Sequence, residues 1–132
     1  LEHRGTSEGD NVRAALSICQ WKHPGNKDGY ATEISDVTCR NLYFDDIQSD
    51  GTYIFVWQMP GQTESSYIRN LAFENIEIND ANRVKNPVFQ AVTNENYIPG
   101  MTVDNFSISG KKVLSTGRDF MCSGNISDLS IN

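Results

Sequence analysis

The stretch Ile68-Arg-Asn-Leu-Ala-Phe-Glu-Asn-Ile-Glu-Ile decides the fold of this 132-residue chain, because similar segments recur at three other places. The related segments begin at Ile34, Val103 and Ile126, so the four starts lie 34, 35 and 23 residues apart. Aligned on their first residues, the four copies are apolar at the third and fifth offsets. These residues are Val37, Leu71, Phe106 and Leu129, then Cys39, Phe73, Ile108 and Ile131. The step of two between them indicates a β-strand, and the long recurrence indicates stacked units.

Polar residues recur in the same frame. Two residues after each start stand Asp36, Asn70, Asn105 and Asp128. Equivalent positions in stacked parallel strands lie about 4.8 Å apart, so each amide would reach the next one. The sequence therefore predicts an all-β fold, a parallel β-helix of about four coils. The alternative, an antiparallel sandwich, explains the alternation but not the matching side-chain types at fixed offsets.

A second, shorter strand is predicted in each coil. Residues 53–59 and 88–92 form two copies, in which Phe55 and Phe89 are equivalent because each follows its repeat start by 21 residues. Phe120 begins a third copy, and residues 12–21 form a further strand candidate. Variable loops follow this shorter strand, on the side where a solenoid usually builds its ligand groove.

The chain is expected to be one β-helix segment over residues 1–132, with residues 1–11 as a loop or tail. It has neither a starting Met nor a leader, and it stops directly after a good strand, so we expect a fragment of a longer solenoid. The remaining coils of the parent chain would then be its partners. The three cysteines, Cys19, Cys39 and Cys122, are predicted to be buried free thiols.

Charge and composition narrow the possible partners. The net charge is −6, and no basic run is longer than Lys111-Lys112, which argues against nucleic acid. No apolar stretch approaches the roughly 18 residues of a membrane span, so no membrane partner is expected. The chain has no acidic cluster of the calcium-binding kind and no cysteine-histidine set, so we expect neither a metal nor another cofactor.

The repeats Ile68-Arg-Asn-Leu-Ala-Phe-Glu-Asn-Ile-Glu-Ile and Val103-Asp-Asn-Phe-Ser-Ile resemble the coils of right-handed parallel β-helix proteins of the pectin-lyase-like superfamily. They are closest in style to polygalacturonases and dextranases, over about residues 34–132. The resemblance implies part of a secreted or cell-surface glycoside hydrolase acting on a plant or microbial polysaccharide. Its motifs belong to the coil scaffold, which does not fix a chemistry.

Catalysis in those relatives implies aspartates on neighbouring coils, with companion Asn-Thr-Asp and Gly-His-Gly motifs. This chain has neither motif. Asp45-Asp46 is interpreted as a solvated ledge at a strand end, and Arg83-Val84-Lys85 as a chance likeness to the Arg-Ile-Lys motif. The catalytic residues are therefore unknown, and we expect them outside this segment.

Aromatic and amide side chains near the shorter strand are the candidate substrate-binding residues. Indole and phenol rings pack on the C–H faces of sugars, and amides bond to their hydroxyls. The candidates are Trp21, Trp57, Gln58, Gln90, Asn94 and Tyr97. Two interpretations of Trp57 stay open, a core residue and a sugar contact, because the sequence does not fix the phase of its strand. Two other functions also stay open: a non-catalytic glycan-binding or structural module, and a polysaccharide lyase.

Overall fold

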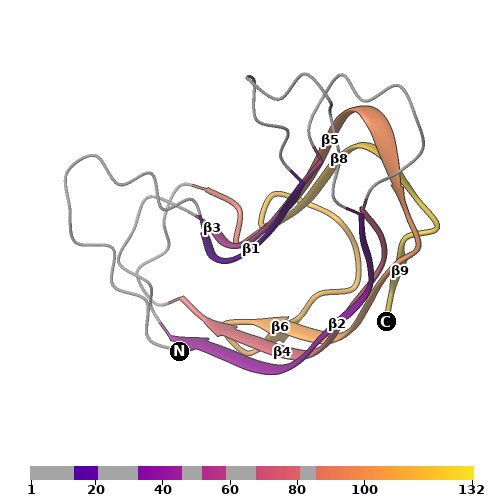
Figure 1. Cartoon of the computed structure of the whole chain (residues 1–132). Helices are drawn as coiled ribbons and strands as arrows, with labels where there is room; N and C mark the ends of the chain where they lie inside the picture. Colours follow the sequence, from indigo (N-terminus) through magenta and orange to yellow (C-terminus); the bar gives the residue numbers. More distant parts are fainter. Residues whose placement is uncertain (1–13, 21–32, 46–51, 59–67, 81–85) are drawn as a thin grey trace, which may run out of the picture.

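A computed structural model of the chain describes residues 14–20, 33–45, 52–58, 68–80 and 86–132, and these form an all-β structure (Figure 1). The strands are β1 (Ala14–Gln20), β2 (Ile34–Asp45), β3 (Thr52–Gln58), β4 (Ile68–Asn79), β5 (Phe89–Pro99), β6 (Met101–Ile108), β7 (Lys111–Lys112), β8 (Phe120–Ser127) and β9 (Ser130–Ile131). The described ranges contain no helix long and apolar enough to cross a membrane.

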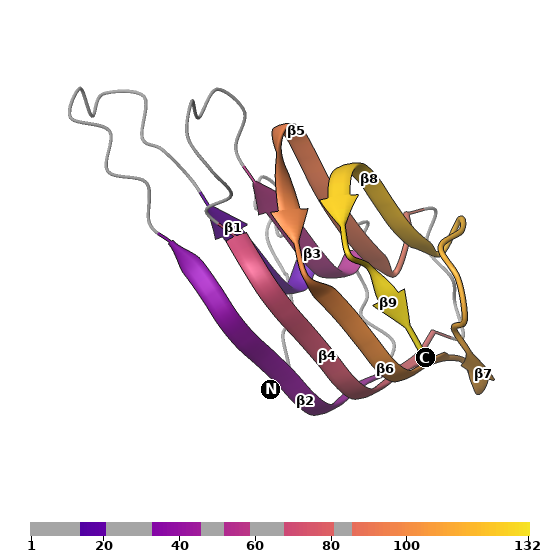
Figure 2. The same ribbon diagram turned by 90° about the vertical axis from the view of Figure 1, so that its right-hand side faces the viewer.

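The strands form two sheets, and the chain crosses from one to the other after nearly every strand. One sheet has the order β1-β3-β5-β8, and the other has the order β2-β4-β6-β7 with β9 also paired to β6. Figure 2 shows the successive strands of each sheet side by side. All pairings are parallel except the short β6-β7 hairpin. The predicted all-β class and parallel pairing are thus confirmed.

The third repeat lies five residues away from its predicted register. Ile34 pairs with Ile68 as expected, but Val103 pairs with Phe73 and not with Ile68. The predicted match of Asn105 with Asn70 is therefore wrong. The error has a physical cause. The strand β4 carries Asn70 and Asn75, five residues apart, whereas the third copy carries Asn105 alone, so Asn105 can be aligned with either of them.

The shorter strands are also shifted, by one residue. Ile54 pairs with Phe89, and Phe55 pairs with Gln90. The predicted equivalence of Phe55 and Phe89 is wrong, because the connection before β5 is one residue longer than the one before β3 when counted from the paired residues Asp45 and Asn79. A one-residue slip places a side chain on the opposite face of the sheet.

The hydrophobic core lies between the two sheets and centres on Phe89. This ring is stacked on Phe120 with centroids 4.1 Å apart, and its edge contacts Phe73 at 5.2 Å and Phe106 at 5.9 Å. All four phenylalanines are at most 1% exposed. Aromatic pairs in these geometries add to the stabilisation that burial gives, so this cluster holds the two sheets together.

Left-handed residues interrupt the alternation in the sheet of β2, β4 and β6. In β4, Asn70 (φ 52°) and Asn75 (φ 53°) have positive φ. Each adds one residue to the strand, so that the buried positions follow steps of three, two, three and two; they are Ile68, Leu71, Phe73, Ile76 and Ile78. Asparagine tolerates this backbone conformation better than most residues. The apolar third and fifth offsets of the repeat follow directly from this geometry.

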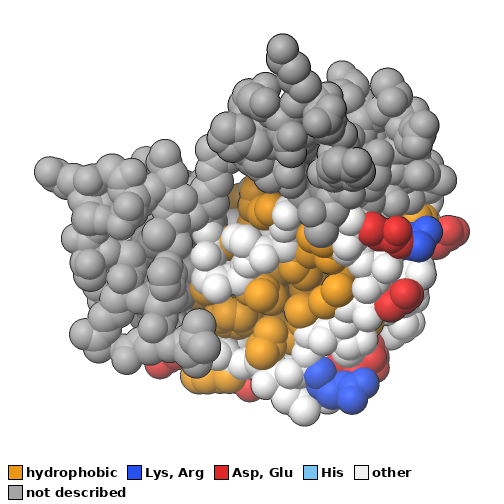
Figure 3. All heavy atoms as spheres, viewed as in Figure 1, with side chains coloured by type: hydrophobic (Ala, Val, Ile, Leu, Met, Phe, Trp, Pro, Cys, Tyr) orange, Lys and Arg blue, Asp and Glu red, His pale blue; other side chains and the backbone are white. Residues whose placement is uncertain are grey.

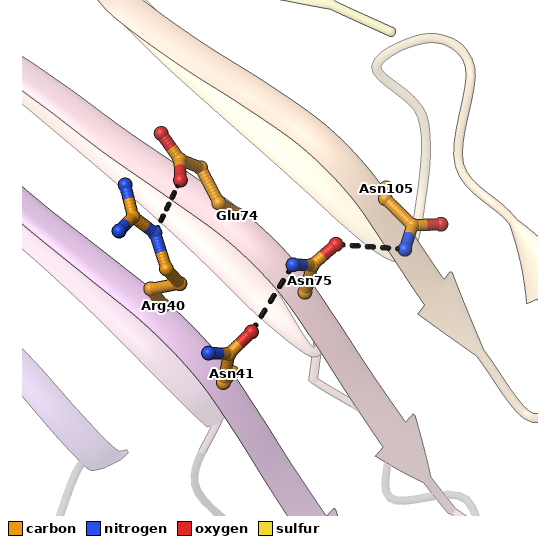
Figure 4. Close-up of polar contacts among 5 residues, drawn as sticks. All are labelled: Arg40, Asn41, Glu74, Asn75 and Asn105. Carbon is orange, nitrogen blue, oxygen red and sulfur yellow. Dashed lines mark hydrogen bonds and ion pairs between the residues drawn. The ribbon is translucent and has the colours of Figure 1, made fainter.

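Side chains at these positions form hydrogen-bonded ladders across the strands. Asn105 donates from Nδ2 to Asn75 Oδ1 at 2.9 Å, and Asn75 donates to Asn41 Oδ1 at 3.1 Å (Figure 4). In a second column, Asn70 donates to Asp36 Oδ1 at 2.9 Å. Ladders of this kind fix the register between neighbouring strands, because a shifted strand would leave each amide without its partner.

We predict that Gly100→Ala destabilises the protein by about 2 kcal/mol or more, against about 1 kcal/mol for the control Gly110→Ala. Both glycines have positive φ, at 73° and 76°, so both variants strain the backbone. Only at Gly100 would the new Cβ meet a neighbour, Asn70 Oδ1 at 2.6 Å, whereas nothing lies within 4 Å at Gly110. Urea unfolding measures the difference, and equal losses would contradict the close contact.

Asn75→Ala is expected to lower the free energy of unfolding by about 2 to 4 kcal/mol, because it removes two side-chain hydrogen bonds and puts alanine, which tolerates positive φ less well than asparagine, at this position. Asn75→Gly relieves the backbone strain and loses the same bonds, so it should cost less. Thermal or urea unfolding of the two variants separates the contributions. A Gly variant that is as unstable as the Ala variant would contradict a cost from positive φ.

Candidate functional site

The outer face of the sheet β1-β3-β5-β8 carries a group of apolar and amide side chains. We define this outer face by Phe55, Trp57, Gln90, Val92 and Met121. Side chains alternate along a strand, and Ile54 and Val56 belong to the core, so the residues between them point away from it. Strand phase thus places Trp57 on the face opposite Ile54 and Val56.

Strand register brings the members of the outer face together. Trp57 pairs with Val92, and Phe55 pairs with Gln90, which in turn pairs with Met121. Adjacent strands lie about 4.8 Å apart, so Trp57 and Gln90 are diagonal neighbours within reach of one ligand. Phe55 is 9% exposed, whereas Trp57 and Gln90 are half-buried. The outer face therefore places an indole, an amide and a phenyl ring next to one another.

Gln58 lies on the inner face of β3 and is 0% exposed. Its Oε1 accepts a hydrogen bond from the backbone N–H of Ile68 at 3.1 Å, which links the end of β3 to the start of β4. Among the described residues its Nε2 has no hydrogen-bond partner. The structure thus gives Gln58 a place inside the fold and separates it from Trp57 and Gln90.

The other three predicted residues are described less fully. Trp21 lies outside the described residues. Asn94 and Tyr97 belong to β5, where the register shifts between Val92 and Tyr97, but their side chains are outside the described part of the structure. Arg83-Val84-Lys85 is likewise outside it.

Acidic groups are sparse near the outer face. Within β1, β3, β5 and β8 the single acidic residue is Glu95, whose side chain is not described. Asp45, exposed at the end of β2, accepts a hydrogen bond from Asn79 at 2.7 Å and belongs to a ladder. No group of three or more potential metal ligands occurs in the described ranges. The described members of the outer face therefore offer apolar, aromatic and amide side chains.

The three cysteines are not joined to one another by disulfides, and their environments differ. Cys19 is exposed, so the prediction of a buried thiol is wrong there, because β1 is an edge strand and Cys19 faces away from the core. Cys39 and Cys122 are half-buried. Burial raises the pKa of the Cys122 thiol to about 11 and also raises the pKa of Cys39.

Comparisons with protein-family models, with curated proteins and with solved structures found no match to this chain. The outer face must therefore be interpreted from its own geometry. Phe55, Val92 and Met121 were not among the predicted binding residues, because the uninterrupted apolar run of β3 hides the phase of that strand. The one available signal was the run Tyr53-Ile-Phe-Val-Trp, which is apolar at every position and so fits a strand covered on both faces.

At pH 8 we expect iodoacetamide to modify Cys19 well before Cys122. The thiolate is the reacting species, and a thiol with a pKa near 11 is almost entirely protonated at pH 8. Raising the pH towards 10 should accelerate modification of Cys122, as measured by mass spectrometry of the digested protein. Equal rates at pH 8 would contradict the burial of Cys122.

Proposed function

We propose that the chain forms coils of a right-handed parallel β-helix and that its outer face binds a polysaccharide. The alternation of the chain between two parallel sheets supports the β-helix, as do the stacked amide columns Asp36-Asn70 and Asn41-Asn75-Asn105. The observation that carries the binding function is the placement of Trp57 beside Gln90 on the face turned away from the core.

Two side chains make the proposed contact. The indole of Trp57 packs against the C–H face of a sugar ring, and the amide of Gln90 both donates and accepts hydrogen bonds with ring hydroxyls. Phe55 supports this pair from the same face, because its register partner is Gln90. Successive strands repeat at about 4.8 Å, so a chain of sugars can run across β3, β5 and β8.

We further propose that this segment belongs to an extracytoplasmic glycoside hydrolase, with its catalytic acids supplied by other coils of the parent chain. Inverting hydrolysis needs two carboxyl groups roughly 6.5 to 9.5 Å apart across the scissile bond. The scarcity of acids in β1, β3, β5 and β8 fits a role in holding substrate. The same scarcity equally favours the second candidate, a glycan-binding module without catalysis. A polysaccharide lyase ranks below both, because its clustered calcium ligands are not found among the described residues.

Trp57→Ala should reduce saccharide affinity about tenfold or more, and Gln90→Ala by a smaller factor, because the indole supplies most of the apolar contact. The purified chain is first screened on an array of plant and microbial polysaccharides, and the best ligand is then titrated by calorimetry. Tyr43→Ala is the matched control, because Tyr43 is an aromatic residue 61% exposed on the other sheet. Failure of the chain to bind any saccharide, or equal losses for Trp57→Ala and Tyr43→Ala, would contradict the proposal.

Hydrolase and binding module are distinguished by a second experiment. The parent protein and the 132-residue chain are incubated with the bound polysaccharide, and released reducing ends are measured. We expect release by the parent and none by the chain. A parent that binds through Trp57 and releases nothing would favour the non-catalytic module.

A further inference from the structure

The strands β1 and β2 stand first in their sheets, and among the described strands none pairs with the outer edge of either; we call that edge of β2 the open edge. The inward side chains of β2 are half-buried, whereas their register partners in β4 are at most 1% exposed. These residues of β2 are Ile34, Val37, Cys39, Leu42 and Phe44. Figure 3 shows a hydrophobic surface on the molecular face that β1 and β2 occupy in Figure 1.

The opposite side of the same sheet is built differently. There β6 pairs with β9 through Thr102 and Val103, and with the antiparallel β7 through Ser107 and Ile108. The strand β7 consists of Lys111 and Lys112, both exposed, and lysine on an edge strand discourages further pairing. Among the described strands of this sheet, β2 is thus the long one with an edge that no described strand covers.

Two of the ladder columns end in an aspartate at the open edge. Asp36 and Asp45 stand in columns where β4 carries Asn70 and Asn79. An ionised carboxylate only accepts hydrogen bonds, whereas an asparagine both donates and accepts. Each carboxylate already accepts one bond from β4 and has further lone pairs for another donor. A strand added at the open edge must therefore bring N–H groups to both positions.

The middle column has the opposite requirement. Asn41 accepts from Asn75, and its Nδ2 points away from Asn75 (Figure 4). A strand added at the open edge therefore needs an acceptor over Asn41. Asparagine meets this need as well as the need for donors, because it offers both an oxygen and an NH2 group.

A second copy of the chain does not meet these requirements. The Asp36 column continues through Asn70 and Gly100 to Asp128, so head-to-tail stacking of two copies would place Asp128 over Asp36. Like charges directly opposite each other in neighbouring strands are destabilising. The apolar columns match, because Leu129 would cover Val37, but the carboxylates oppose the contact.

We propose that the open edge docks an extended strand from a different polypeptide segment, parallel to β2, with amide or cationic donors over Asp36 and Asp45. The added strand places an acceptor over Asn41 and apolar side chains over the half-buried row of β2. Main-chain hydrogen bonds supply affinity in strand addition, and the side-chain pockets supply specificity. This interaction does not depend on saccharide binding by the outer face.

The sequence of β4 itself provides the probe, because Ile68–Asn79 carries asparagine at all three ladder positions and apolar residues at every inward position. A fluorescent 12-residue peptide of this sequence is titrated into the full chain at 150 mM salt and followed by anisotropy. The control peptide carries Asn70→Asp and Asn79→Asp. We expect the unmodified peptide to bind about tenfold tighter than the Asp peptide.

Two further controls separate ladder recognition from general charge repulsion. A peptide with Arg69→Gln and Ala72→Asp has the same net charge as the Asp peptide and should bind about as well as the unmodified one, because it keeps the three asparagines. In the folded protein variant Asp36→Asn/Asp45→Asn, checked by circular dichroism, the preference for the unmodified peptide should fall below about threefold.

Several outcomes would overturn the proposal. They are no binding of the unmodified peptide, equal binding of the unmodified and Asp peptides by the wild-type chain, and an unchanged preference in a folded double variant. Sedimentation velocity of the wild-type chain at about 100 μM should give a monomer. A dimer there would identify a second copy as the occupant and would likewise overturn it.

Discussion

The fold depends on left-handed residues at fixed positions in the strands of one sheet. Asn75, at φ 53°, is the central case, because it both accepts from Asn105 and donates to Asn41. Its backbone conformation changes the spacing of buried residues, and its side chain bonds the strands on either side. One residue type thus satisfies a steric and a hydrogen-bonding requirement at the same point. The register of the sheet follows, and with it the columns of apolar side chains that form the core.

Much of the fold could be predicted from the sequence, but its register could not. The repeat at Ile34 and Ile68 is identical in spacing to the structural pairing, so the class and the parallel arrangement were accessible. The register of the third copy could not be predicted, because Gly100 occupies the column of Asn70. Asn105 was then the one asparagine in that copy that could be aligned with the asparagines of β4. In β3, an uninterrupted apolar run hid the strand phase. Periodicity carries phase information only when polar residues alternate with apolar ones.

The candidate site was predictable only in its residue types. Trp57 and Gln90 share the outer face because Phe55 pairs with Gln90, and that pairing depends on the length of the connection before β5. Gln58, which is chemically similar to Gln90, points inward and bonds to the backbone of Ile68. Two glutamines predicted for one role thus lie on opposite faces. A difference of one residue in the length of a connection decides which amide can reach a ligand.

The pairing of Asn105 with Asn75 and not with Asn70 is the central claim, and nuclear Overhauser effects between side-chain amides test it most directly. We expect cross-peaks that connect the Asn105 amide protons to Asn75 and the Asn75 amide protons to Asn41, in agreement with donor distances of 2.9 and 3.1 Å. Cross-peaks between Asn105 and Asn70 without any to Asn75 would contradict this register, and with it the columns on which the core and the outer face depend.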